Sequence, residues 1–255
     1  MALPSHVLTS ETVSVRRLDR RTTEDMWRVF HCYYEDVARP RFEEDLRPKS
    51  HVILLRDSGD RSLQGFSTLQ TYERTVQGRR LAVLYSGDTI VGQAYWGQTA
   101  LQKAWLAYAM RLKLRFPHLP TYWFLITKGY KTYLLMSRNF PEYWPRWDQA
   151  TPSWQQAVLD HLATEKFGDT YDPEAGVIRH DEPLGKLREG IAPIQEETRR
   201  AHQDIRFFAE QNPGHLQGDE LCCLGRIDLA LCRAYLTKLG RRTLRRATRR
   251  WLPAR

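Results

Sequence analysis

The sequence has few cysteines and no long apolar segment. Its four cysteines form no Cys-x-x-Cys pair, and Cys222 and Cys223 are adjacent, a spacing unsuited to an ordinary disulfide bond. We therefore expect reduced thiols and a cytoplasmic protein. No apolar run approaches the ~20 residues that a membrane-spanning helix needs, and Met1–His6 show neither the basic nor the apolar region of a secretion signal. We expect neither standard secretion nor integral insertion into a membrane.

The sequence also lacks the common signatures of hydrolases, nucleotide-binding enzymes and metalloproteins. No Gly-x-Ser-x-Gly, Walker or His-Glu-x-x-His motif is present. The histidines are scattered without the spacing of metal ligands. Even His180, which precedes Asp181 and Glu182, belongs to a run of sequence neighbours that do not converge on one ion. We expect no metal site and interpret the histidines as surface or hydrogen-bonded side chains.

Positive charge is concentrated at the end of the chain. The net charge is +9, and eight of the 39 Lys and Arg residues lie between 238 and 255, so that 31 remain against 30 Asp and Glu elsewhere. Residues 236–255 also carry apolar side chains at helical spacing, including Trp251, with arginines on the opposite arc. Such a basic amphipathic tail is typical of a segment that lies on an anionic membrane, which would make the protein peripheral to it. Binding to nucleic acid, which we favour less, binding to an acidic carrier protein, and a simply solvated tail remain open.

The first half of the chain predicts a mixed α/β sheet. At 42% hydrophobic and 11% aromatic residues, 255 residues suffice for a real core. The expected order is a helix that begins near residue 22, a short helix at 41–46, strands at 51–56, 63–75 and 81–91, a long helix at 96–115, a strand at 122–127 and a helix at 130–137. The three successive strands with short turns form an antiparallel meander, and the third is apolar on both faces and therefore central. The helix between the third and fourth strands is a crossover, which places these two strands side by side and parallel.

The second half of the chain has a weaker pattern. Residues 154–166 and 229–239 look helical, 187–210 looks like a largely charged helix, and 176–179 and 219–224 look like strands. These elements either complete the same sheet or form an accessory lobe. We divide the chain into a core at 1–145, a C-terminal extension or lobe at 146–235, and the basic tail at 236–255.

This element order, over residues 22–141, resembles the Gcn5-related N-acyltransferase (GNAT) superfamily. The resemblance implies a mostly antiparallel GNAT-like sheet flanked by helices, in which the two parallel strands splay apart to admit the pantetheine arm of an acyl thioester. It also implies that the turn after the central strand holds phosphate at a helix N-terminus. The family pattern, (Gln/Arg)-x-x-Gly-x-(Gly/Ala), corresponds here to Trp96–Leu101.

The phosphate loop departs from that pattern in part. Gly97 and Gln98 suit the loop. Thr99, which precedes Ala100, stands where the family has a glycine that lets the backbone approach the phosphate closely, and Leu101 stands where the family has a small residue. On the resemblance, residues 97–100 bind the donor. The departure leaves two donor forms open, acyl-CoA and the acyl-phosphopantetheine of an acyl carrier protein. The second is used by members such as the long-chain N-acyl amino acid synthases.

Four residues are candidates for the chemistry. Ser86, Gly87 and Asp88 lie late on the central strand, where the family has a bulge beside the thioester, so that Gly87 would polarise the carbonyl and Asp88 would act as general base. Tyr133, after the fourth strand, is the candidate acid for the leaving thiolate. Each candidate also has a purely structural interpretation. Ser86, Gly87 and Asp88 would simply bend the strand, and Tyr133 would be an aromatic side chain of the core. The resemblance implies an N-acyltransferase acting on an amine of a small molecule or amino acid; the alternative is a non-catalytic GNAT-like protein recruited to membrane or nucleic acid by its tail.

Overall fold

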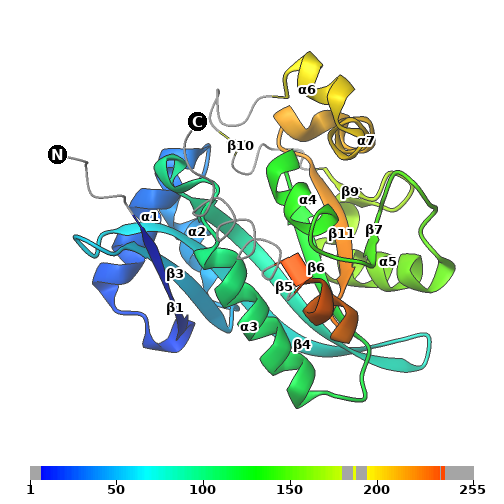
Figure 1. Cartoon of the computed structure of the whole chain (residues 1–255), viewed down its shortest axis with the longest axis horizontal. Helices are drawn as coiled ribbons and strands as arrows, with labels where there is room; N and C mark the ends of the chain where they lie inside the picture. Colours follow the sequence, from blue (N-terminus) through cyan, green and yellow to red (C-terminus); the bar gives the residue numbers. More distant parts are fainter. Residues whose placement is uncertain (1–6, 180–185, 188–193, 236, 239–255) are drawn as a thin grey trace, which may run out of the picture.

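A computed structural model describes residues 7–179, 186–187, 194–235 and 237–238, and its centre is one large sheet (Figure 1). The strands are β1 (Leu8–Ser14), β2 (Tyr34–Glu35), β3 (His51–Asp57), β4 (Leu63–Val76), β5 (Arg79–Val91), β6 (Thr121–Thr127), β7 (Tyr143–Trp144), β8 (Tyr171–Asp172), β9 (Val177–Ile178), β10 (Lys186–Leu187) and β11 (Glu220–Arg226). The α-helices with assigned bounds are α1 (Arg20–Tyr33), α2 (Arg39–Leu46), α3 (Ala100–Arg115), α4 (Tyr130–Ser137), α5 (Ser153–Phe167), α6 (Glu196–Ala201) and α7 (Gln203–Gln211). Residues 229–235 are also helical.

The large sheet is mixed and mostly antiparallel, which confirms the predicted α/β fold class. Its strand order is β1-β3-β4-β5-β6-β11-β9-β8, with β7 also paired to β11. The β5–β6 pair is parallel, and the other pairs of this sheet within the described chain are antiparallel. The predicted meander of three strands and the predicted crossover through a long helix are therefore both present.

The second half of the chain completes this sheet, which is one of the two arrangements that the sequence left open. Strand β11 runs antiparallel to β6 from Leu221↔Thr127 to Arg226↔Tyr122, and β9 and β8 follow beyond it. The single helix expected over 187–210 is wrong. Residue 187 belongs to β10, and His202, whose backbone is extended, separates α6 from α7. Of these two helices only α7 has buried side chains, so no continuous apolar stripe joins α6 to α7.

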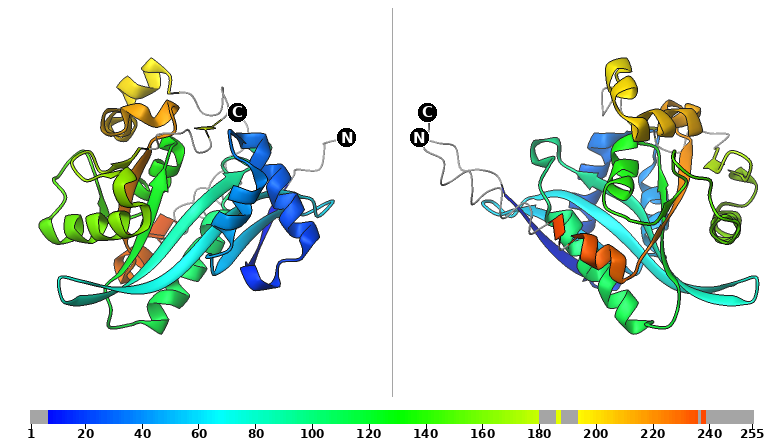
Figure 2. Two further views of the ribbon diagram at one scale, coloured as in Figure 1. Left: turned by 180° about the vertical axis from the view of Figure 1, so that it is seen from behind. Right: turned by 45° about the vertical axis from the view of Figure 1, so that its right-hand side comes forward.

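The helices cover the sheet from two sides (Figure 2). Alternate residues of β5 show the division, because successive strand side chains point to opposite faces. Leu84 packs in one apolar cluster with buried residues of α3 and α4, whereas Val83 packs in another with buried residues of α5. Ile90, farther along β5, joins a third cluster that includes Phe30 of α1 and Phe42 of α2. The central strand is therefore covered on both faces, as its sequence predicts.

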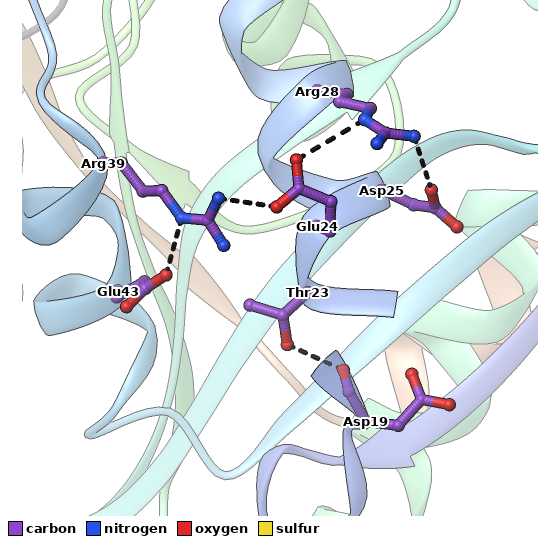
Figure 3. A network of polar contacts seen from close by, with 7 residues as sticks. All are labelled: Asp19, Thr23, Glu24, Asp25, Arg28, Arg39 and Glu43. Carbon is purple, nitrogen blue, oxygen red and sulfur yellow. Dashed lines mark hydrogen bonds and ion pairs between the residues drawn. The ribbon is translucent and has the colours of Figure 1, made fainter. Parts of the chain in front are cut away.

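A polar network fixes α2 against α1 (Figure 3). The guanidinium of Arg39 donates to Glu24 of α1 at 2.6 Å and to Glu43 of its own helix at 2.9 Å. Helix α1 begins at Arg20, slightly before the predicted start, because the side chain of Asp19 accepts a hydrogen bond from the Thr22 amide at 2.7 Å and caps the helix. The two helices form one wall of the cavity described below.

The predicted basic tail lies almost wholly outside the described residues. Residue 236 and residues 239–255 belong to that part of the chain, so the membrane, nucleic-acid and carrier-protein roles expected of the tail stay predictions. Within the described residues, no helix combines the length and the apolar character that crossing a membrane requires.

Candidate active site

The parallel strands β5 and β6 separate partway along their length. They pair from Ala82↔Thr121 to Ser86↔Leu125. Beyond that point β5 stays with β4, as far as Val91↔Gly65, while β6 stays with β11, as far as Thr127↔Leu221. The sequence predicted that these strands are parallel neighbours, and the resemblance implied that they splay; the strand pairing shows both features.

A β-bulge lies at the first residues beyond the last β5–β6 pair. Opposite β5, Leu69 pairs with Ser86 and Ser67 pairs with Thr89, so Gly87 and Asp88 together oppose Thr68 alone. An extra residue of this kind leaves the hydrogen-bond ladder and bends its strand.

The bulge leaves no room for a side chain at position 87. A Cβ at Gly87 would lie 2.9 Å from Thr68 Oγ1 and 3.0 Å from Lys49 Cε. Thr68 Oγ1 is itself buried and has no hydrogen-bond partner among the described residues. A side chain at position 87 therefore requires Thr68 and Lys49 to shift, which favours glycine there.

A cavity of about 550 Å³ opens where the two strands separate. Gly87 and Asp88 line it from β5, and Ile126 and Thr127 line it from β6. Further walls come from α1, α2, the turn before α3, the start of α4 and the end of α5. A volume of this size is typical of a small-molecule site.

Asp88 is a half-buried carboxyl group in this cavity. Burial raises its pKa from the ordinary value of 3.8 to about 6, with smaller opposing effects from the positive charges of Lys49 and Lys128 and reinforcement from Asp45 and Glu220. A carboxylate with a pKa close to neutral can accept and return a proton near physiological pH. The structure thus places at Asp88 a carboxyl group whose pKa lies close to neutral pH.

Three lysines line the cavity near Asp88. Lys128 lies 3.9 Å from Glu220 of β11, in nitrogen–oxygen distance, and Lys49 and Lys166 lie against the ring of Tyr85. Sequence reasoning missed Lys49 and Lys166. No local signal marks them, since each lies in an ordinary polar stretch and only the fold brings them together.

The loop before α3 forms the other end of the cavity. Gly97 and Gln98 line it, and Gly97 has a positive φ of 89°, a conformation that favours glycine. Gln98 accepts a hydrogen bond from the Leu8 amide at 2.8 Å, which ties the loop to β1. The long helix begins at Ala100 and not at residue 96 as predicted, because residues 93–95 form a separate 3-10 turn. Thr99 is the N-cap residue, and its side chain makes no capping bond.

The amides of the first turn of α3 therefore lie behind this end of the cavity. The first turn of a helix leaves backbone N–H groups without helical partners. Lys131 of α4 also lines the cavity, with its Nζ 3.5 Å from the centre of the Trp96 ring. These groups give this end of the cavity a positive character.

Ser86 and Tyr133 do not line the cavity. The hydroxyl of Ser86 is buried and accepts a hydrogen bond from Trp123 Nε1 at 2.6 Å. Tyr133 is fully buried, and its hydroxyl donates to the carbonyl oxygen of Pro145 at 3.0 Å. Burial raises the pKa of Tyr133 far above its ordinary value. These positions favour packing roles for both residues, and of the four candidates only Gly87 and Asp88 face the cavity.

Within the part of the chain that the structure describes, no three His, Cys, Asp or Glu side chains lie together as a metal site would require. Cys222 and Cys223 are fully buried in β11, which the sequence predicts as a strand at 219–224.

Solved structures with some likeness to this chain include N-acetyltransferases. A protein of unknown function from Enterococcus faecalis, described as a probable N-acyltransferase, is 17% identical with a TM-score of 0.39 and covers 51% of this chain and 32% of its own. A GNAT family N-acetyltransferase from Escherichia coli, YhbS, in complex with CoA, is 16% identical with a TM-score of 0.38, over 54% of this chain and 70% of its own. An aminoglycoside acetyltransferase from an uncultured soil metagenomic sample, in complex with sisomicin, is 15% identical with a TM-score of 0.37, over 57% of this chain and 93% of its own.

No protein-family model matches the sequence, and no curated protein is similar to it in sequence. The chain spans about a third of the length of the first of these structures and more of the others, at low identity. What the chain does has to be inferred from its own residues.

Proposed function

We propose that the chain is an acyltransferase that moves an acyl group from a pantetheine thioester to an amine of a small molecule. The observation that carries this proposal is the separation of β5 from β6 at a glycine bulge, with a cavity and a half-buried carboxyl group at the same point. A gap between two strands admits a long, narrow donor arm. The bulge and the carboxyl group then lie beside the reactive end of that arm.

The residues at the bulge suit the two halves of the reaction. An amine is protonated at neutral pH and must lose a proton before it attacks, and Asp88, with a pKa of about 6, can accept that proton directly or through a water molecule. The new C–N bond then forms as the C–S bond breaks, the nitrogen loses its second proton, and the leaving thiolate takes up one proton, so that the products are the amide, the thiol and one proton released to the solvent. A backbone N–H released from the ladder at Gly87 would stabilise the oxyanion that develops on the carbonyl oxygen.

The opposite end of the cavity suits the donor's phosphate groups. Backbone amides at a helix N-terminus, together with the positive end of its dipole, attract anions. Here the start of α3, with Gly97 and Gln98 before it and Lys131 across from it, supplies that environment. Acyl-CoA and the phosphopantetheine of an acyl carrier protein share the chemistry that this end would bind.

Transfer can be tested directly by mass spectrometry. The purified full chain is incubated with acyl-CoAs of graded chain length, and separately with acylated carrier protein, each with a panel of amines. We expect acylated amine and free thiol in equal amounts with at least one donor. Indifference to every thioester, in both binding and turnover, would overturn the proposal.

Asp88→Asn is the informative variant, and Asp60→Asn is its matched control. Asp60 lies in the exposed turn between β3 and β4, where its carboxylate accepts hydrogen bonds from the amide and the hydroxyl of Ser62. We expect Asp88→Asn to lose turnover and Asp60→Asn to keep it. An Asp88→Asn variant as fast as the parent would remove Asp88 from the role of base.

A further inference from the structure

Two lysine side chains from distant parts of the chain meet over one tyrosine ring in the cavity. Lys49 lies between α2 and β3, and Lys166 lies in the last turn of α5. Their Nζ atoms lie 5.2 Å and 4.3 Å from the centre of the Tyr85 ring. All three residues line the cavity. Two positive charges that share one ring repel each other, so a further group is expected to offset them.

Neither Lys49, which is buried, nor Lys166, which is partly exposed, has a carboxylate within 4 Å among the described residues. Only 9% of Lys49 is exposed, yet among the described residues its Nζ makes no hydrogen bond or ion pair within 4 Å. Lys166 has one long contact of 3.5 Å, to Gln70 Oε1. Buried lysines are normally paired. Burial lowers the pKa of both lysines, that of Lys166 to about 8 with the charge of Lys49 contributing; the charges of Asp88 and Asp45 oppose the shift of Lys49, and those of Asp45 and Glu165 oppose that of Lys166. These carboxylates offset the burial only in part, and a bound anion would offset it further.

The position of Lys49 limits where such an anion can lie. Its Nζ is 3.4 Å from the point where a Cβ on Gly87 would stand, so it lies at the bulge itself. On the proposed function, the amine under attack lies there too, beside Asp88. The anion must therefore be close to the amine in the same molecule. In an α-amino acid, two bonds of about 1.5 Å separate the amine nitrogen from the carboxyl carbon, which places the two groups about 2.5 Å apart.

Acidic groups line the cavity near the same point. Asp45 and Glu220 line it together with Asp88, and their charges act on the groups around the bulge. A site that combines unpaired lysines with carboxylates is complementary to a molecule that carries both a carboxylate and an ammonium group. A simple amine would leave Lys49 and Lys166 unpaired, and a simple acid would have no atom to acylate.

We propose that Lys49 and Lys166 form an anionic subsite that binds the carboxylate of an amino acid, whose adjacent amine is the group acylated. This proposal rests on the proposed acyl transfer and adds the class of acceptor. The lysines are binding residues here and take no part in the proton transfer that we assign to Asp88.

Matched acceptors test the subsite. Amino acids, their carboxamides and the corresponding amines without the carboxyl group are compared at a fixed thioester concentration. We expect kcat/KM for the acids to exceed that for the carboxamides roughly 10- to 100-fold, the range of one charge-assisted hydrogen bond. Amino acids whose carboxylate is several bonds farther from the amine are expected to lose most of this preference.

Lys166→Gln and Lys49→Gln are expected to erase the preference. Each variant should raise KM for the acids roughly 10-fold or more and change KM for the carboxamides less than about twofold. The control is Arg111→Gln, which removes one positive charge from the exposed side of α3, outside the cavity lining. Wild-type protein that acylates acids and carboxamides equally well, or lysine variants that keep the preference, would overturn the subsite and leave acyl transfer standing.

A measurement without turnover keeps the two proposals separable. The rate at which acetic anhydride labels Lys49 and Lys166 is followed by mass spectrometry with amino acids, with their carboxamides, or with inorganic phosphate present. We expect severalfold slower labelling of both lysines with the amino acids only. Protection by phosphate alone, or by none of these probes, would overturn the carboxylate subsite even in a protein that transfers no acyl group.

Discussion

Replacing Asp88 by asparagine is expected to abolish turnover and at the same time to stabilise the fold. The two effects have one cause, because the burial that makes Asp88 a suitable base also makes its charge costly. Asparagine has nearly the same shape and no charge at any pH. It therefore behaves as a permanently neutral substitute for the protonated carboxyl group.

The size of the gain follows from the pKa. Burial raises it from 3.8 to about 6, a difference of about two, and each pKa unit corresponds to 1.36 kcal/mol, so the buried charge costs about 3 kcal/mol. The attraction of Lys49 and Lys128 for the carboxylate is already contained in that pKa. Because the folded state holds the proton more tightly, stability falls as pH rises from about 4 to 6. The cost is fully present above about pH 6 and absent below about pH 4, where both states are protonated.

Unfolding in urea at pH 4, 5, 6 and 7.5, followed by tryptophan fluorescence, measures this difference. We expect Asp88→Asn to gain up to about 3 kcal/mol over the parent at pH 7.5, relative to the difference between them at pH 4. Asp60→Asn should show little change with pH over this range, because hydrogen bonds from Ser62 hold the pKa of Asp60 below its ordinary value of 3.8, so that its titration lies below the range measured. In the parent, kcat/KM should fall below about pH 6 as Asp88 is protonated. A stability difference that does not change with pH would refute the assignment of a costly buried charge.

Three further substitutions separate packing from chemistry. Gly87→Ala brings a Cβ to 2.9 Å from Thr68 Oγ1, so we expect a loss of about 1–3 kcal/mol in unfolding free energy together with slower turnover; a fully active, equally stable variant would contradict the bulge geometry. Ser86→Ala leaves the buried Trp123 Nε1 without its acceptor, which should cost about 1–3 kcal/mol in urea unfolding and leave the pH dependence of kcat/KM unchanged; a shifted acid limb would give Ser86 a part in the chemistry. Lys131→Gln should raise KM for acyl-CoA severalfold with little change for the acceptor, and steady-state kinetics in which only the acceptor KM moves would place the donor elsewhere.

The central part of the fold is predictable from the sequence because its signals are local. Apolar runs of strand length, separated by short polar turns, mark β3, β4 and β5, and a long helical pattern before another apolar run marks the crossover to β6. Handedness and spacing then make the last two strands parallel neighbours.

The elements that sequence reasoning missed have no such signal. Strand β1 is Leu-Thr-Ser-Glu-Thr-Val-Ser, a mostly polar strand that pairs with β3 at the edge of the sheet as the structure describes it. Its place depends on the partner strand and not on its own pattern. Likewise β2 and β10 are two residues long and pair with each other from positions far apart in the chain, which no local pattern can show.

The residues of the candidate site also differ in whether a local sequence signal marks them. Gly87 and Asp88 stand out because small and acidic residues interrupt an apolar strand, and both face the cavity. Tyr133 is a candidate acid only through the family resemblance, and its hydroxyl donates a hydrogen bond to the carbonyl oxygen of Pro145. Lys49 and Lys166 come from a loop and from a helix end more than a hundred residues apart, so only the completed sheet brings them to Tyr85.

One extra residue in β5 accounts for the main features of the site. Up to Ser86 the strand pairs on both sides, with Leu69 of β4 and Leu125 of β6. The bulge at the next two residues bends β5, and because β5 regains its register with β4 and not with β6, the bend opens the parallel pair. The same displacement turns Asp88 into the resulting cavity, where burial raises its pKa. The gap, the base and the constraint on glycine at position 87 are thus consequences of a single irregularity in the sheet.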